Sequence, residues 1–221
     1  MPPARPILLT GFEPFAGERL NPSWEAARAL DGRRIGGRTV VARCLPVVFG
    51  AARQTLLAAL AELRPELVLC LGLANGSPHL ALERVALNLD DARIADNQGQ
   101  QPVDLPVVEG APAAYFTGLP VKAMLAALRA AGFPAALSLS AGSFVCNHVF
   151  FALCQHLAGQ ESGTRGGFMH VPLLPSQAAS GQPSMALATL VAAVEVALAA
   201  ALANEKDLGT AGGSLAGEIT G

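Results

Sequence analysis

The sequence predicts an α/β protein, a three-layer α/β/α sandwich around a mainly parallel twisted sheet. Apolar runs of strand length alternate with helix-length periodic segments along the whole chain. Several of the strand-like runs lack alternation of polar and apolar residues, as expected for strands buried on both faces. With 52% hydrophobic residues in 221, the chain can bury a sizeable core. We expect one domain over residues 1–203 and a flexible tail over residues 204–221, which is rich in Gly and Thr.

The elements follow in order from the hydrophobic pattern. Five apolar runs have the length of buried strands: Ile7–Thr10, Thr39–Leu45, Leu67–Leu71, Ala135–Ser140 and Gly167–Val171. Five segments predict helices: Pro22–Leu30, Gly50–Leu63, Val121–Ala131, Phe144–Leu157 and Ser184–Ala203. Between Glu83 and Tyr115 the pattern changes to an alternating exposed strand or ribbon, followed by a Gly-, Pro- and Asp-rich excursion. Because that excursion is too long for an ordinary connection, we expect a functional or interface loop.

Capping residues support the helix boundaries. Asn21 can cap the first helix, with Pro22 at its first position, Gly132 can end the third and Ser184 can cap the last. The last helix is nearly long enough to span a bilayer, but Glu195 near its middle would cost about 2.5 to 3.5 kcal/mol there. We therefore interpret it as a helix of a soluble protein, with a leucine stripe that packs on the core.

Composition excludes several classes of function. The formal charge is 15 − 17 = −2 and no run of Lys or Arg occurs, so neither a nucleic-acid partner nor a membrane partner is expected. The four cysteines are scattered and the N-terminus lacks the apolar stretch of a signal peptide, which indicates a reducing cytoplasm. No C-x-x-C or H-E-x-x-H spacing is found, and we expect neither a metal nor a cofactor.

We expect reactive residues at strand-to-helix junctions, because open α/β sheets bind ligands beyond the carboxyl ends of their strands. The first junction, TGFEPF, carries Phe12 and Phe15, two aromatics in a chain with only 5% aromatic residues. It lacks the glycine and lysine pattern of a phosphate loop. Both phenylalanines can equally be ordinary core residues.

The second junction brings a cysteine to the start of a helix. Cys146 follows the strand that ends near Ser140, and a thiol in the first turn of a helix is stabilised as thiolate by the helix dipole. Gly142 and Ser143 are expected to leave backbone amides free near the sulfur, as an oxyanion hole requires. A cysteine in an apolar helix is often only a core residue, which is how we interpret Cys154.

The third junction, GGFMHVP, ends the last predicted strand at His170, which we place on the same sheet edge as Cys146. A thiolate nucleophile needs an imidazole within hydrogen-bond reach, although a histidine here can also simply bind a carbonyl. A third group must hold the imidazole tautomer, and Glu83 is the best candidate. The alternatives are Asp90, Asp91, Asp96 and Asp104, and Glu83 can also form a local pair with Arg84 or Arg93.

Five blocks in order then carry a resemblance: TGFEPFAGERLNPSWEA, ERVALNLDDARIADNQG, PAAYFTGLPVKAM, AGSFVCNHVFFALCQHL and GGFMHVPLLPSQ. Over about residues 7–203 the sequence closely resembles pyroglutamyl peptidase type I, a family of cytosolic cysteine peptidases. The resemblance implies that Cys146 is the nucleophile, His170 the general base and Glu83 the orienting carboxylate. The implied substrates are N-terminally pyroglutamylated peptides.

The resemblance also implies a substrate pocket. Its expected lining residues are Phe12, Phe15, Asn21, Phe144 and Val145. Arg93 would lie close to the reaction centre, where it helps to hold the oxyanion. A neutral lactam ring suits an apolar pocket of this kind.

The chain departs from the family pattern in one loop. Where the family usually reads GQAGGR, this chain reads GLANGS, with Leu73 in place of glutamine and Ser77 in place of arginine. Ala95 likewise replaces a usual proline. Because the glutamine typically supports the pocket, Leu73 is expected to weaken lactam binding or shift the substrate preference.

Two other functions are alternatives to the peptidase. One is an α/β enzyme of the nucleoside phosphorylase type, which would need a phosphate cradle that the sequence does not offer. The other is a binding protein that has lost the activity through the GLANGS loop. The family also implies a homo-oligomer, a dimer or a tetramer, which the apolar C-terminal helix and the long excursion would permit.

Overall fold

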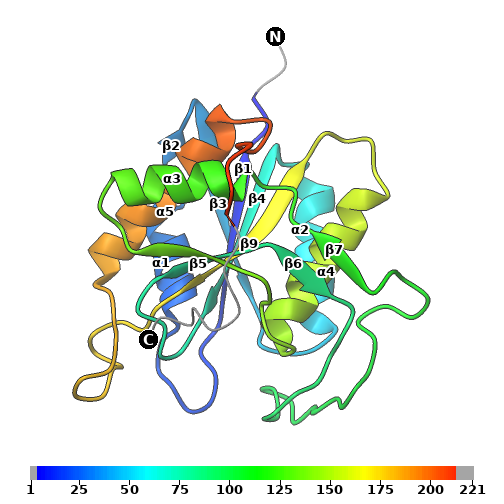
Figure 1. Ribbon diagram of the computed structural model, residues 1–221. Coiled ribbons are helices and arrows are strands. Elements are labelled where there is room, and N and C mark those ends of the chain that lie inside the picture. The colour runs from blue at the N-terminus through cyan, green and yellow to red at the C-terminus, as the bar shows by residue number, and fades with distance from the viewer. Residues whose placement is uncertain (1–3, 213–221) are drawn as a thin grey trace.

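The fold is a seven-stranded sheet between two layers of helices (Figure 1). The computed structural model describes residues 4–212. The strands run in the order β2 (Arg34–Ile35), β3 (Arg38–Leu45), β1 (Ile7–Phe12), β4 (Leu67–Leu73), β9 (Arg165–Val171), β5 (Leu80–Glu83) and β8 (Ala135–Ser138). The four strands from β3 to β9 are parallel. β2 is antiparallel to β3, and β5 and β8 are parallel to each other but antiparallel to β9.

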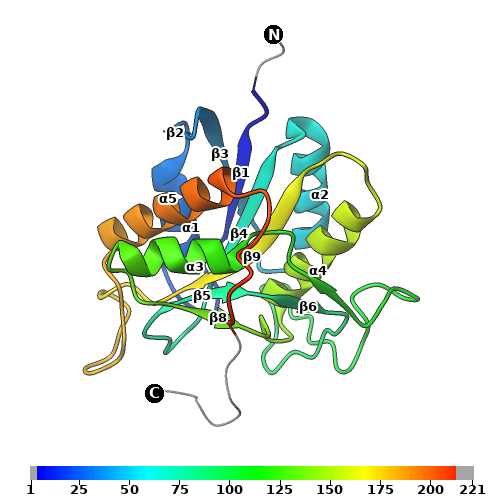
Figure 2. The same ribbon diagram turned by 45° about the horizontal axis from the view of Figure 1, so that its top comes forward.

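Five helices cover the two faces of the sheet. They are α1 (Pro22–Leu30), α2 (Ala51–Leu63), α3 (Val121–Ala130), α4 (Val145–Ala158) and α5 (Leu187–Ala203). α5 packs between α1 and α3 on one face, as Figure 2 shows, and α2 packs against α4 on the other. The three-layer mainly parallel sandwich predicted from the sequence is confirmed. None of the helices within residues 4–212 is long and apolar enough to cross a membrane.

Each face of the sheet has its own apolar core. Beneath α1, α3 and α5 the core is aliphatic, with Leu9, Leu69 and Val194 fully buried. Beneath α2 and α4 it is richer in aromatics and includes Phe150, Phe151 and Phe168. Side chains on one strand alternate between these two cores, which explains why the strands lack a polar face in the sequence.

Helix boundaries follow the predicted caps in two cases out of three. The Asn21 side chain accepts a hydrogen bond from the Ser23 N–H at the start of α1, and Gly132 adopts a left-handed conformation just after α3. The prediction that Ser184 caps the last helix is wrong. Ser184 pairs with Leu173 in an isolated β-bridge, so the chain stays extended and α5 starts at Leu187.

The segment after β4 also differs from the prediction. Glu83 does not open an exposed ribbon, because it is the last residue of β5, a strand inside the central sheet, and is 1% exposed. The ribbon comprises only β6 (Val85–Leu87), which pairs with β7 (Ala114–Phe116) in a separate two-stranded sheet. The predicted strand to Ser140 ends at Ser138, where the Ser138 hydroxyl donates a hydrogen bond to the Ser140 carbonyl and bends the chain.

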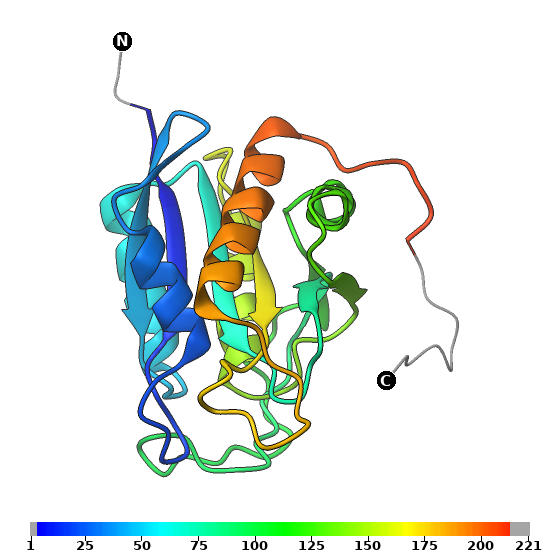
Figure 3. The same cartoon turned by 90° about the vertical axis from the view of Figure 1, so that its left-hand side faces the viewer.

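Long loops gather at one end of the molecule. Figure 3 shows the β1–α1 loop, the excursion between β6 and β7, and the loop before α5 together at the end opposite the N-terminus. Four strands point their carboxyl ends toward these loops. This is the end at which an open α/β sheet binds ligands.

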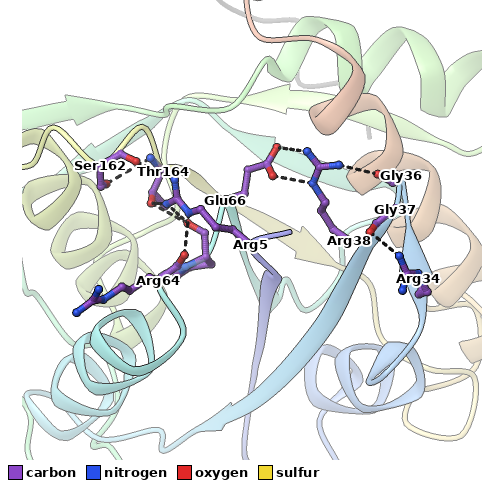
Figure 4. Close-up of polar contacts among 10 residues, drawn as sticks. Arg5, Arg34, Gly36, Gly37, Arg38, Arg64, Glu66, Ser162 and Thr164 are labelled. Carbon is purple, nitrogen blue, oxygen red and sulfur yellow. Dashed lines mark hydrogen bonds and ion pairs between the residues drawn. The ribbon is translucent and has the colours of Figure 1, made fainter. Parts of the chain in front are cut away.

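At the opposite end of the sheet, Arg5 ties the start of the chain to two loops (Figure 4). Its guanidinium donates hydrogen bonds to the carbonyls of Arg64 (2.9 Å), Pro65 (2.5 Å) and Ser162 (2.8 Å) and to the Thr164 hydroxyl (2.5 Å). One side chain therefore joins β1, the end of α2 and the approach to β9.

The C-terminal segment lies against α3 up to residue 212. The Asp207 carboxylate accepts the backbone N–H groups of Lys122 and Ala123 at 2.9 and 3.0 Å, and the Lys122 ammonium donates to the Thr210 carbonyl. The N-cap residue of α3, Pro120, makes no side-chain cap. Residues 213–221, the second half of the predicted flexible tail, lie outside the described residues.

Candidate active site

Cys146 occupies the first turn of α4, directly above the carboxyl end of β4. A Cβ atom added to Gly72 of β4 would lie 2.8 Å from the Cys146 sulfur, so the missing side chain of Gly72 makes room for the thiol. Gly72 is the residue paired with His170 across β4 and β9. The sheet register therefore brings the thiol and the imidazole together.

His170 and Glu83 meet across the antiparallel pair β9 and β5. In this register His170 is opposite Ala81 and Glu83 is opposite Phe168, so His170 and Glu83 are diagonal neighbours on one face of the sheet. His170 Nδ1 lies 2.8 Å from Glu83 Oε1. Because the carboxylate fixes the proton on Nδ1, Nε2 is the nitrogen left for the thiol.

The environment of His170 favours its charged form. Burial lowers the pKa of this imidazole, but hydrogen bonds to Cys146 and Glu83, with the negative charge of both groups, outweigh burial and raise the pKa to about 10. The second carboxylate oxygen of Glu83 has no hydrogen-bond partner within residues 4–212. The charge of Glu83 therefore acts mainly on the ring of His170.

A small apolar cavity of about 150 Å³ opens over the thiol and the imidazole. It contains seven of the nine residues predicted for the site: Phe12, Phe15, Asn21, Phe144, Val145, Cys146 and His170. Leu73, Val47 and Ala141 complete the lining. No carboxylate or basic side chain other than His170 lines this cavity among the described residues, so it suits a neutral, compact group.

The remaining two predicted residues lie just outside the cavity. Glu83 does not line the cavity. Its carboxylate contacts His170, which does line it. Arg93 lines a neighbouring cavity of about 490 Å³, which shares Phe15, Leu73 and Phe144 with the smaller one. Val47 was not predicted, although it follows the end of β3 and the junction rule used for the other strands would have found it.

Asn21 lines the cavity, yet its amide is engaged by its own loop. Its oxygen accepts from the Ser23 N–H at 3.1 Å and from the Ser23 hydroxyl at 2.8 Å, and its NH₂ donates to the Glu13 carbonyl at 3.0 Å. These bonds hold the β1–α1 loop against the end of β1. Asn21 thus shapes the wall that carries Phe12 and Phe15.

The backbone around the thiol offers donors, but not at Gly142. Its N–H donates to the Ser140 hydroxyl at 3.1 Å, so the expectation of a free amide at that residue is wrong. The N-cap residue Phe144 makes no side-chain cap, which leaves the first-turn amides of α4 open toward the cavity end. Such amides are suited to a developing negative charge.

The route by which Cys146 reaches the site also differs from the expected one. β8 runs antiparallel to β9, so its carboxyl end does not share the sheet edge at which β4 and β9 end. Ser138 pairs with Glu83 across β8 and β5, and Glu83 pairs with Phe168 across β5 and β9. Phe168 precedes His170 by two residues in β9. The chain from Leu139 to Phe144 covers the remaining distance and delivers Cys146 to the cavity.

The competing carboxylates and thiols have other surroundings. Asp90 pairs with the buried His148 at 2.8 Å, and Asp96 accepts backbone N–H groups from its own loop and from Phe49. Burial raises the pKa of Cys154 to about 12, which leaves this thiol protonated and inert near neutral pH. No three His, Cys, Asp or Glu side chains gather as a metal site within residues 4–212.

A buried imidazole between a carboxylate and a cavity-facing thiol, on an α/β sandwich, is the arrangement of enzymes that transfer acyl groups through a cysteine. Sequence comparison agrees with this class. Residues 5–204 match the family model described as pyroglutamyl peptidase. The chain belongs to the pyroglutamyl peptidase family, whose members are cysteine peptidases.

Individual relatives are similar over almost their whole length. The pyrrolidone-carboxylate peptidase of Cupriavidus necator is 55% identical over 214 residues, which cover 96% of this chain and 99% of the relative. The crystal structure of pyroglutamyl peptidase I from Bacillus amyloliquefaciens has a TM-score of 0.91 at 41% identity, covering 94% of this chain and all of that one. Pyrrolidone carboxyl peptidase from Thermococcus litoralis has a TM-score of 0.87 at 40% identity, covering 90% and 94%.

Proposed function

We propose that this protein is a cysteine exopeptidase that removes an N-terminal pyroglutamyl residue from peptides. The observation that carries the proposal is the small cavity in which Cys146 and His170 face an apolar, uncharged lining. A pyroglutamyl residue is a neutral five-membered lactam, whereas an N-terminal glutamate or glutamine carries an ammonium group. That ammonium would be buried there without a carboxylate partner, which is costly.

The proposed reaction is acyl transfer in two steps. The Cys146 thiolate attacks the carbonyl carbon of pyroglutamate, the S–C bond forms, and the first-turn amides of α4 receive the oxyanion. The C–N bond then breaks as protonated His170 gives its proton to the departing amine. Water, deprotonated by His170, hydrolyses the thioester, which releases pyroglutamate and restores the thiolate and the protonated imidazole. Glu83 stabilises the imidazolium whenever His170 is protonated, and it orients the neutral ring between the two steps.

The pocket roles belong to the same proposal. Phe12 and Phe15 from the β1–α1 loop and Phe144 and Val145 from α4 pack around the ring. Phe15 and Phe144 already contact one another at 6.4 Å between ring centroids. Leu73 adds an apolar side chain to this wall.

The test is release of a fluorescent amine from a pyroglutamyl amide, with prolyl and glutamyl amides as controls. We expect turnover of the pyroglutamyl compound only, and its loss in Cys146→Ala. Turnover of the glutamyl compound at a similar rate, or retention of activity in Cys146→Ala, would contradict the proposal.

We also infer that the protein is cytoplasmic and forms a homo-oligomer, a dimer or a tetramer. Large apolar side chains that are exposed in this protomer support the assembly, notably Phe116 of β7 at 76% exposure and Leu105 in the excursion at 54%. Light scattering on the purified protein measures the subunit number, and a monomer at micromolar concentration would overturn the inference.

A further inference from the structure

The larger cavity next to the catalytic pocket has a composition of its own. It is lined on one side by the shared residues Phe15, Leu73 and Phe144, and beyond them by Ile94 and Leu173. Ile94 is 36% exposed in the excursion between β6 and β7, and Leu173 lies just after β9. Together these five side chains form the apolar part of the cavity, which adjoins the small cavity that contains the thiol.

The chemistry of the substrate decides what enters this larger cavity. A pyroglutamyl residue is blocked at its nitrogen by the lactam ring, so a peptide continues from it only on the carbonyl side. If the ring fills the small cavity and its carbonyl meets Cys146, the rest of the peptide must leave through the opening of that cavity. The neighbouring cavity, which shares three lining side chains with the small one, is the adjacent space that can receive the rest of the peptide.

Polar and charged side chains line the rest of this cavity. Asp91, Glu18 and Arg93 line the cavity, so carboxylates outnumber cations there by two to one. The Glu18 carboxylate is held by a hydrogen bond from the Gln177 amide at 3.1 Å. An acidic side chain entering the cavity would face net repulsion.

We propose that this second cavity is the subsite for the residue that follows pyroglutamate, and that it selects a large apolar side chain over a small or an acidic one. The proposal rests on the proposed function. Leu73, Ile94 and Leu173 provide the contact surface, and the excursion between β6 and β7 thereby takes part in substrate selection.

The experiment compares kcat/KM for pyroglutamyl-leucine amide, pyroglutamyl-alanine amide and pyroglutamamide, whose leaving group is ammonia and leaves the second cavity empty. The expected preference for leucine over alanine is about tenfold. Ile94→Ala should reduce this preference to about threefold or less and leave kcat/KM for pyroglutamamide unchanged. A pyroglutamyl-aspartate substrate should be slower than its isosteric asparagine counterpart.

Val103→Ala is the matched control, because Val103 is 63% exposed in the same excursion but lines neither cavity. It should keep the full leucine preference. Equal kcat/KM for leucine and alanine substrates, or an unchanged preference in Ile94→Ala, would overturn the subsite while the peptidase function stands. Failure to cleave pyroglutamamide and every peptide would instead overturn the proposed function.

Discussion

Among single residues, Glu83 has a clear effect on His170: its carboxylate lies 2.8 Å from Nδ1 and helps to raise the pKa of the imidazole. The imidazole has an ordinary pKa of about 6.5, and hydrogen bonds to Cys146 and Glu83 overcome burial to raise it to about 10. The folded protein therefore holds this proton more tightly than the unfolded chain. The resulting stabilisation is complete below about pH 6.5 and is lost as the pH rises through 10.

Replacing Glu83 with glutamine should therefore change the pH dependence of catalysis as well as its rate. We expect kcat to fall by about 10³-fold to 10⁴-fold, because the imidazolium loses its counter-charge and the tautomer is no longer fixed. We expect the alkaline limb of the kcat/KM profile near pH 10 in the wild type, from the raised pKa of His170, and at lower pH in the variant. A lower rate with the alkaline limb unmoved would mean that Glu83 serves only the packing of β5.

At the scale of single elements, α3 depends on a residue far along the chain. Its own N-cap position, Pro120, provides no side-chain acceptor, and Asp207 accepts the Lys122 and Ala123 amides instead. Asp207→Ala should lower the free energy of unfolding by about 1 kcal/mol, measured by urea denaturation. Glu205→Ala is the control, since no hydrogen bond of the Glu205 side chain is found within residues 4–212, and an equal loss in both variants would refute the cap.

The elements that the sequence could predict are those whose pattern is local. Buried strands such as β4 and amphipathic helices such as α3 follow from their own hydrophobic residues, and Asn21 and Gly132 act within one turn of the helix that they cap. Ser184 looks like an equally good cap, but pairing with Leu173 holds it in an extended conformation. A contact between segments outweighed the local preference there.

The residues that gather at the candidate site were easier to predict than the strands that hold them. Cys146 and His170 follow from the junctions, whereas β5 is too short to be predicted from its pattern, and its last residue, Glu83, was taken as the start of an exposed ribbon. Only the pairing of β5 with β9 buries Glu83 beside His170. The antiparallel direction of β5 and β8 is likewise set by contacts across the sheet, which the sequence pattern does not encode.

In the molecule as a whole, one end of the sheet forms the candidate site and the other end contributes to stability. The loop-rich end carries the cavities, and the other end is joined by Arg5 (Figure 4). Arg5→Ala should cost about 2 kcal/mol of unfolding free energy and leave kcat/KM unchanged, because it removes several charge-assisted hydrogen bonds far from the thiol. Exposed Arg34, which bonds one carbonyl within its own turn, is the control, and Arg34→Ala should change stability by less than about 0.5 kcal/mol. A similar loss in both variants, or an altered kcat/KM, would contradict this division.

In the proposed reaction, Cys146 becomes acylated by the pyroglutamyl group. Rapid acid quenching during turnover, followed by mass spectrometry of proteolytic fragments, tests it most directly. We expect a mass increase of one pyroglutamyl group on the peptide that contains Cys146, and none on those with Cys44, Cys70 or Cys154. A pyroglutamyl group on another residue, or continued turnover with Cys146 alkylated, would contradict it.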